Sequence, residues 1–422
     1  MNMKRLTLSL IALGAVATPL GAQLTLPDMG QGAAGRTLGG IGGTLGDTVG
    51  DLGGQTVGQT VGSVTRTVRG LAQARLDRLD RLVRANRKLI EKDAAGDLAR
   101  RGELLLLDGG ANAIATAQRA GFVVLSRERL DDLGVEVVRL AVPSGMGLAR
   151  AQGVLAQALP GATISADTLH FPGGTASGRA GDAAGGVTRA MPPIATPVGV
   201  IDGGATPVLK PAEMRGFARG APKASDHGSA VTSLLQFAGV QRVLVADVYG
   251  SDPAGGNALA VAKGLDWLVG KGVKVVSVSL VGPANPLLAR AVAAAQGRGA
   301  VIVAAVGNDG PAAPPAYPAS YPGVIAVTAV DGRNRALIEA GRALHLDYAA
   351  PGADIAATNA AGRRVKVRGT SFATPLVASR VALKWGAGMG PKLDAEAIDL
   401  GARGPDGTYG RGLLCTICRP AR

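Results

Sequence analysis

Aromatic residues are scarce in this chain, and so are residues that carry imidazole or thiol chemistry. Of 422 residues, two are Trp, five are Tyr, five are Phe, three are His and two are Cys. Single-stranded nucleic acids are commonly bound by aromatic stacking, and no RNA- or DNA-binding motif accompanies the 45 Lys and Arg residues, which are spread along the chain. The net charge of +14 therefore does not indicate a nucleic-acid partner.

Long apolar runs are also missing, with one exception at the N-terminus. A basic pair at residues 4–5 precedes an apolar run over residues 6–16, and cleavage points follow after Ala17 or Ala22. This pattern is typical of a secretory signal peptide and is too short for a membrane span, which needs about 18 or more apolar residues. We therefore expect residues 1–22 to be a signal peptide and the protein to be secreted or periplasmic.

The two cysteines, Cys415 and Cys418, form a C-x-x-C near the C-terminus. In an exported chain such a pair is either a redox or metal-binding pair or a small local disulfide that holds the tail. A zinc site would need two further ligands, so the local disulfide is favoured.

Composition divides the next part of the chain into two segments. Residues 23–70 are rich in Gly, Thr, Val and Gln and repeat a TVG unit, which is typical of a flexible low-complexity segment. Residues 71–101 begin with apolar residues at helical spacing, separated by arginines, which predicts a basic amphipathic helix to about Lys92. Such a helix either lies on a membrane surface or docks on a neighbouring element, and docking is favoured.

Residues 102–172 have the pattern of a small α+β domain. The expected strands are 103–107, 122–125, 136–141 and 164–170, and the expected helices are 111–120 and 147–158. The order βαββαβ is that of the ferredoxin-like, split βαβ arrangement. A Gly/Ala-rich linker follows over residues 173–196.

Residues 197–422 alternate valine-rich strands with helical stretches. The expected strands are 198–201, 243–248, 275–280, 301–306 and 324–330, and the expected helices are 230–237, 256–269 and 286–298. Near-continuous apolar strands between helices predict an α/β domain with a buried parallel sheet and helices on both faces. Reactive groups in such domains gather where the strands end.

Three candidate residues follow or flank these strands. Asp202 ends the first strand in VGVIDGG, where it either orients a histidine or forms a turn. His227 opens a helix in DHGSAV, and it alone of the three histidines stands at a helix start before a glycine, although a lone histidine is usually structural. Asn308 follows a strand in AAVGNDGP, where it forms a turn or aims its amide N–H at an oxyanion.

The fourth candidate is Ser371, in the dense run RGTSFATP. Gly369 and Thr370 place this serine at the start of a helix, where its backbone N–H has no intrahelical partner and can help to hold an anion. Pro375 falls in the early part of the helix, where a missing N–H costs least. A capped helix with no chemical role is the alternative interpretation.

Taken together, VGVIDGG, DHGSAV, AAVGNDGP and GTSFATP strongly resemble the motifs of the subtilisin-like serine peptidases, the subtilases, in the same chain order. The resemblance covers about residues 197–414. It implies that Ser371 is the nucleophile, His227 the general base and then acid, and Asp202 the group that fixes the imidazole. It also implies that Asn308 and the Ser371 N–H form an oxyanion hole.

The same resemblance implies a zymogen. The α+β domain of residues 102–172 resembles the family's propeptide, which acts as folding chaperone and inhibitor. We therefore expect autocatalytic processing within residues 173–196 and a subtilisin-like catalytic domain over residues 197–422. The expected partners are a protein or peptide substrate and the chain's own propeptide, and the enzyme is expected to be a monomer.

The resemblance also locates a substrate cleft. Ser279, Leu280, Val281 and Gly282 match the cleft-lining stretch, along which an extended substrate would pair as an added strand. A second match puts Ala316 at the floor of the pocket for the substrate's P1 residue and implies a cis peptide bond between the next two residues. Val281 and Ala316 are bulkier than the glycines frequent in relatives, so we expect a small apolar P1 residue.

No cofactor is implied. The segment between His227 and Val243 is short, so we expect the calcium loop of many relatives to be missing, and no dense Asp/Glu cluster replaces it. Calcium is therefore not indicated by the sequence.

Two functions of other classes remain open. One is a subtilase-fold protein that no longer cleaves and only binds peptides or partners; the intact set of four site residues argues against it. The other is a surface-attachment protein that acts through residues 23–95.

Overall fold

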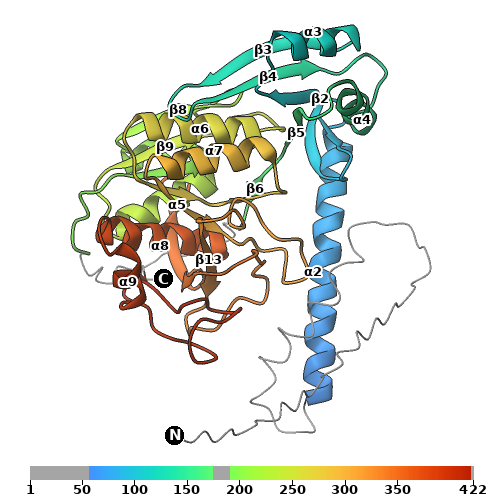
Figure 1. Ribbon diagram of the computed structural model, residues 1–422. Coiled ribbons are helices and arrows are strands. Elements are labelled where there is room, and N and C mark those ends of the chain that lie inside the picture. The colour runs from blue at the N-terminus through green and yellow to red at the C-terminus, as the bar shows by residue number, and fades with distance from the viewer. Residues whose placement is uncertain (1–56, 174–190, 420–422) are drawn as a thin grey trace, which may run out of the picture. The chain divides into compact units, whose positions relative to one another are not determined.

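The computed structural model describes residues 57–173 and 191–419, with side chains from residue 65 onward (Figure 1). The expected signal peptide, most of the Gly/Thr-rich segment and residues 174–190 of the linker lie outside the described residues. All described residues belong to one unit, Thr37–Arg422.

A seven-stranded sheet forms the centre of the C-terminal half, in the order β14-β13-β12-β10-β7-β9-β8, and every neighbouring pair is parallel. Its strands are β7 (Val198–Asp202), β8 (Glu213–Gly216), β9 (Val243–Asp247), β10 (Val275–Val278), β12 (Val301–Ala305), β13 (Ile325–Val330) and β14 (Tyr348–Pro351). The central strands are buried along their whole length, as expected for a parallel sheet covered on both faces. β8 and β14 were not expected from the sequence.

Helices cover both faces of this sheet, which confirms the predicted α/β architecture (Figure 1). The helices α5 (Asp226–Phe237) and α8 (Thr370–Lys384) pack on one face, and α6 (Ala258–Gly270) and α7 (Pro286–Gly297) on the other. The remaining elements are η3 (Pro207–Leu209), β11 (Leu280–Val281), β15 (Ile355–Thr358), β16 (Arg364–Val367) and α9 (Met389–Asp394).

The α+β domain has the predicted ferredoxin-like topology. Its elements are β2 (Leu98–Leu107), α3 (Ala111–Arg119), β3 (Val123–Leu130), β4 (Val135–Ala141), α4 (Leu148–Ala158) and β5 (Thr163–Thr168). The strands lie in the order β5-β2-β4-β3, all antiparallel, and β1 (Ile90–Lys92) adds to the edge of β2. The short strand β6 (Phe171–Pro172) follows and leaves this sheet.

The N-terminal helix differs from the prediction at both ends. The helix α2 spans Val57–Ala85, so residues 57–70 are helical rather than part of a flexible segment. Valines recur there at three- and four-residue intervals, a helical spacing that the abundant glycines obscure.

The predicted helix over residues 71–101 is wrong beyond Ala85. Asn86 closes the last turn, because its side chain donates to the Leu82 carbonyl at 3.0 Å. The chain then turns and enters β1, whose residue Ile90 pairs with Arg100 of β2. Sheet pairing thus overrides a helical pattern that continues in the sequence. No helix within the described ranges has the length and apolar content of a membrane span.

The α+β domain packs its sheet on the helices α6 and α7 (Figure 1). Hydrogen bonds at the N-terminal ends of both helices reinforce this contact. Asn285 caps α7, and its Nδ2 donates to Ser165 Oγ, the Ala166 carbonyl and Thr168 Oγ1 at 2.9–3.0 Å. Asp167 accepts a hydrogen bond of 3.0 Å from the Leu259 N–H in the first turn of α6.

These contacts predict that Asn285→Ala destabilises the uncut chain by about 2–3 kcal/mol, because a helix cap and buried hydrogen bonds to β5 are lost together. Asn257→Ala is the matched control, since Asn257 caps α6 without bonding to β5. It should cost about 1 kcal/mol less. Urea unfolding in a Ser371→Ala background measures both. Equal costs would contradict the role of Asn285 in holding the two domains together.

Candidate active site

The end of β7 and the start of α5 bring Asp202 and His227 together. His227 Nδ1 lies 2.9 Å from both carboxylate oxygens of Asp202. Asp202 is only 1% exposed, and its Oδ1 also accepts the Gly203 N–H at 2.7 Å. A buried carboxylate at Nδ1 favours the tautomer with its proton there, which leaves Nε2 free to accept a proton.

A glycine allows this close approach of helix and strand. A Cβ atom on Gly228 would overlap the Gly203 carbonyl oxygen, so a larger residue would push α5 away from the end of β7. Ser225 caps the same helix, with its Oγ accepting the Gly228 N–H at 2.9 Å. The glycine of the DHGSAV motif therefore holds the distance between His227 and Asp202.

Ser371 stands in the first turn of α8, fully buried, after Gly369 with a φ of 142°. Two reciprocal hydrogen bonds tie it to Ser279 at the end of β10. Ser371 Oγ donates to the Ser279 carbonyl at 3.0 Å, and Ser279 Oγ donates to the Ser371 carbonyl at 2.9 Å. These two bonds fix the position of the candidate nucleophile relative to the strand that borders the cleft.

The second of these bonds explains Pro375, and it corrects the sequence interpretation. Pro375 is the sixth residue of α8, inside the helix rather than where a missing N–H costs least. Its missing N–H would have bonded to the Ser371 carbonyl, four residues earlier. Ser279 Oγ takes that place, so the carbonyl is satisfied although the proline interrupts the ladder.

The Asp–His pair and the serine are not joined by a hydrogen bond in this structure. His227 Nε2 is buried and has no partner among the described side chains and backbone. The imidazole packs on the ring of Phe372, the residue after Ser371, with centroids 5.4 Å apart. Because Ser371 Oγ bonds to Ser279, a change of its side-chain rotamer must precede proton transfer to His227.

The loop after β12 supplies an oxyanion-binding group. Asn308 Oδ1 accepts the Thr370 N–H at 3.0 Å, which fixes the orientation of the amide. Asn308 Nδ2 is buried and unpartnered within the described part of the chain. Together with the Ser371 N–H, this group can donate to the carbonyl oxygen of a substrate that Ser371 attacks.

The chain's own residues run through the cleft. The strand β6 pairs antiparallel with β11, with Leu280 opposite Pro172 and Val281 opposite Phe171. On the other edge, the His170 N–H donates to the Gly256 carbonyl at 2.8 Å. An extended segment whose backbone is hydrogen-bonded on both edges has the arrangement of a bound peptide substrate.

This segment ends at the nucleophile. The Gly173 N–H donates to the Ser279 carbonyl at 3.2 Å, and the Gly173 carbonyl accepts the Ser371 N–H at 3.4 Å. Gly173 thus presents its carbonyl oxygen to one of the two oxyanion donors. No sequence signal marked this residue; the strand was expected to end at residue 170.

The expected substrate-binding residues lie as follows. Ser279–Gly282 run beside β6, and Gly282 exchanges two backbone hydrogen bonds of 2.9 and 3.0 Å with Tyr317. The Tyr317–Pro318 peptide bond is cis, as the sequence indicated. Ala316 is buried and does not line the cavity beside β6.

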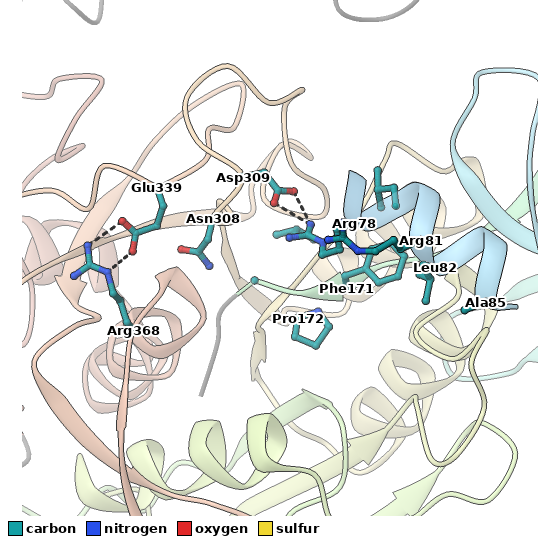
Figure 2. Close-up of a pocket in the computed structure, with 13 residues that line it drawn as sticks. Arg78, Arg81, Leu82, Ala85, Phe171, Pro172, Asn308, Asp309, Glu339 and Arg368 are labelled. Carbon is teal, nitrogen blue, oxygen red and sulfur yellow. Dashed lines mark hydrogen bonds and ion pairs between the residues drawn. The ribbon is translucent and has the colours of Figure 1, made fainter. Parts of the chain in front are cut away.

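A cavity of about 690 Å³ lies between this cleft and the helix α2 (Figure 2). Asn308, Pro172 and Val281 line it on the cleft side, and Leu82 lines it from α2. On its far side Glu339 pairs with Arg368 (Figure 2).

The helix α2 contacts the oxyanion loop directly. Arg78 donates to both carboxylate oxygens of Asp309 at 2.9 and 3.1 Å (Figure 2), and Arg75 lies 3.3 Å from the same carboxylate. Asp309 follows Asn308, and Leu71 packs on Gly310. Docking of the helix, which the sequence favoured, brings it to the residues next to the oxyanion group.

His170 is the most unusual titratable group of the cleft segment. It is fully buried against Gly282, and neither ring nitrogen has a hydrogen-bond partner among the described residues. Burial lowers the pKa of this imidazole to about 4. Nearby Asp167 shifts the other way, because burial raises the pKa of its carboxyl to about 6.

Two further expectations concern metals and cysteines. Cys415 and Cys418 form a disulfide, so the C-x-x-C is the local tail bridge that was favoured. Within the described ranges, no group of three or more His, Cys, Asp or Glu side chains is placed to hold a metal ion. Only residues 238–242 connect α5 to β9.

The His170 environment predicts a pH dependence of the uncut chain. Between pH 6.5 and about 4 the unfolded state binds more protons at His170 than the folded state. This contribution to stability is therefore complete above pH 6.5 and is lost as the pH falls. In a Ser371→Ala background, the urea midpoint should drop more between pH 7.5 and 4.5 with His170 than with His170→Gln. Asp167 is common to both proteins, so its opposite effect cancels. Parallel pH profiles would contradict the prediction.

Comparison with known proteins agrees with this geometry. Residues 216–394 match the model of the subtilase family, a stretch that includes His227, Asn308 and Ser371 and begins after Asp202. Subtilisin Savinase from Lederbergia lenta is 37% identical over 129 residues, 30% of this chain and 48% of that protein. Minor extracellular protease Epr from Bacillus subtilis (strain 168) is 29% identical over 199 residues, 45% of this chain and 30% of that protein. The chain thus spans less than half the length of these relatives.

A solved structure has a fold similar to that of this chain. Fervidolysin from Fervidobacterium pennivorans, a keratinolytic enzyme related to subtilisin, superimposes with a TM-score of 0.61. The match covers 76% of this chain and 61% of that one at 18% identity, so it concerns the fold alone. Motifs, family match and fold agree: the chain is similar to the subtilase family over residues 216–394 and has a subtilisin-like fold.

Proposed function

We propose that the protein is a secreted serine endopeptidase that hydrolyses peptide bonds through an acyl-enzyme on Ser371 and is made as an autoprocessed zymogen. The observation that carries this proposal is the cleft segment, residues 169–173. It lies extended between the strand β11 and the backbone of Gly256 and sets the Gly173 carbonyl oxygen at the Ser371 N–H. A scissile peptide group would need the same placement.

The first half of the reaction forms the acyl-enzyme. Ser371 Oγ turns from the Ser279 carbonyl, transfers its proton to His227 Nε2 and bonds to the scissile carbonyl carbon. The carbonyl π electrons move onto the oxygen, which receives hydrogen bonds from the Ser371 N–H and Asn308 Nδ2. Asp202 stabilises the imidazolium through Nδ1–H. As the C–N bond breaks, His227 gives its proton to the leaving amine.

The second half repeats these roles with water. His227 Nε2 takes a proton from a water molecule, whose oxygen bonds to the acyl carbon. The same two donors hold the oxyanion. Collapse of this intermediate breaks the ester bond, Ser371 Oγ recovers its proton from His227, and the acid product leaves. No cofactor enters this sequence of steps.

The part of the chain up to Gly173 would act as the propeptide. It fills the cleft through β6, packs the ferredoxin-like sheet on α6 and α7, and pairs α2 with Asp309 of the oxyanion loop. Cleavage after Gly173 would release the new C-terminus from the nucleophile. The contacts of the ferredoxin-like sheet with α6 and α7, and of α2 with Asp309, would then keep the cleaved propeptide bound as an inhibitor.

Export and substrate class complete the proposal. The signal-peptide pattern of residues 1–22 supports secretion, and one relative is by its name an extracellular protease. The substrates would be proteins or peptides that enter the cleft extended, and the working form would be a monomer. A subtilase-fold protein that only binds its partner is the alternative, favoured by the hydrogen bond from Ser371 Oγ to Ser279 rather than to His227.

Reaction with a fluorophosphonate separates these two functions. We expect purified wild type to shorten at its N-terminus during incubation and then to label at Ser371, whereas Ser371→Ala stays whole and unlabelled. Intact mass spectrometry reads both outcomes. A wild-type chain that is folded, whole and unlabelled would contradict the endopeptidase. Shortening of Ser371→Ala as well would reveal a contaminating protease.

The oxyanion role of Asn308 has its own test. Asn308→Leu should lower kcat about 100- to 1000-fold with little change in KM, because the lost donor acts on the transition state. Asp309→Asn is the matched control: it neutralises the neighbouring carboxylate, which pairs with α2 and not with the substrate carbonyl, and it should change kcat less than about threefold. Comparable losses in both variants would assign the effect to the loop and not to the amide.

A further inference from the structure

We infer that Val281 restricts the P1 residue of substrates, the residue whose carbonyl is attacked, to glycine, with alanine as the upper size limit. This inference rests on the proposed function and adds a substrate class to it. It is narrower than the small apolar preference expected from the sequence, and it follows from what surrounds Gly173.

Gly173 occupies the P1 position without a side chain, and little space is left for one. A Cβ atom on Gly173 would lie 3.1 Å from Ser371 Oγ, 3.5 Å from Gly307 Cα and 3.6 Å from Val281 Cγ1. The contact with Ser371 Oγ is relieved when that oxygen turns to attack. The other two contacts are ordinary van der Waals distances, so a methyl group fits, and a longer side chain that extends toward the oxyanion loop would meet Val281.

Val281 forms that wall together with Gly307. A Cβ atom on Gly307 would lie 3.3 Å from Val281 Cγ1 and 3.5 Å from Cγ2, so the valine already fills the gap between the cleft strand and the oxyanion loop. A longer P1 side chain would have to enter this gap. With glycine at position 281, both Cγ atoms would be gone and the gap would open.

The valine cannot easily move aside. Its strand β11 is anchored on one side by the reciprocal hydrogen bonds of Ser279 with Ser371. On the other side, Gly282 is fixed by its two backbone hydrogen bonds with Tyr317. A β-branched side chain on such a strand has few rotamers, so the wall is rigid.

The neighbouring positions offer less selectivity. Pro172, at P2, is exposed. Phe171, at P3, packs on the same apolar cluster as Leu79 and Leu82 of α2, which belongs to the part that processing removes. Among P1, P2 and P3, discrimination in the mature enzyme should therefore be strongest at P1. The substrate class is proteins with an extended segment that carries glycine at the cleavage point.

Peptides tested on the processed enzyme decide the inference. The probes are the chain's own residues 167–178 with Gly, Ala or Leu at position 173. Wild type should cleave the Gly peptide with a kcat/KM about 100-fold above that of the Leu peptide, with Ala between them. Val281→Gly should lower this ratio below about tenfold, and Val281→Ala should give an intermediate ratio.

The full chain gives a second readout. Gly173→Leu should slow processing at that bond by about 100-fold, and the double variant Gly173→Leu with Val281→Gly should recover most of the rate. Intact mass identifies the cut bond. The peptide experiment compares rates for different peptides on the same protein, and the full-chain experiment measures whether a second substitution restores a lost processing rate. Partial unfolding of a variant would lower all rates and therefore cannot imitate either result.

The outcomes separate the inference from the proposed function. Equal cleavage of Gly and Leu peptides by wild type would overturn the P1 restriction and leave the endopeptidase intact. Glycine selectivity that persists in Val281→Gly and Val281→Ala would overturn the role of Val281. Failure of wild type to cleave any peptide or to label at Ser371 would remove the proposed function, and the inference with it.

Discussion

The reciprocal hydrogen bonds between Ser279 and Ser371 are the constraint on which the site depends. They join the end of the central strand β10 to the start of the buried helix α8. They compensate for Pro375 inside that helix, hold the nucleophile, and anchor the strand that receives the cleft segment. The bond from Ser371 Oγ to the Ser279 carbonyl also directs this hydroxyl to Ser279 and not to His227. Under the proposed function, one side-chain rotation of Ser371 would precede the chemistry.

The residues up to Gly173 contact the rest of the molecule at several further places. Gly173 meets the nucleophile, β6 extends β11, and Asn285 and Asp167 join the ferredoxin-like sheet to the starts of α7 and α6. The helix α2 closes the far side through Asp309. Two of these contacts, Gly173 on Ser371 and α2 on Asp309, fall on or next to candidate catalytic residues, which suits the proposed role of this segment as a propeptide.

Much of the fold and of the candidate site could be predicted from the sequence, because these features depend on local chemistry. Apolar runs identify the buried strands of the parallel sheet, and the βαββαβ order of residues 102–172 gives the antiparallel sheet topology. Asp202 and His227 meet because each ends or begins an element at the same edge of the sheet. Asn308 and Ser371 were found through short motifs whose glycines permit unusual backbone geometry.

The features that could not be predicted depend on contacts between residues far apart in the sequence. The helical pattern of α2 continues past Ala85, but pairing of Ile90 with Arg100 ends it. Nothing near Gly173 distinguishes it from the glycines that follow in the linker; only its position beside Ser371 does. The ion pairs of Arg75 and Arg78 with Asp309 join residues more than 200 positions apart, and no local pattern specifies them.

The most direct test of the account is a crystal structure of the uncut Ser371→Ala chain. The account predicts the Gly173 carbonyl oxygen within hydrogen-bond distance of the residue 371 N–H and close to Asn308 Nδ2, with β6 paired to β11. A cleft that is empty, or one filled by another segment of the chain, would contradict it.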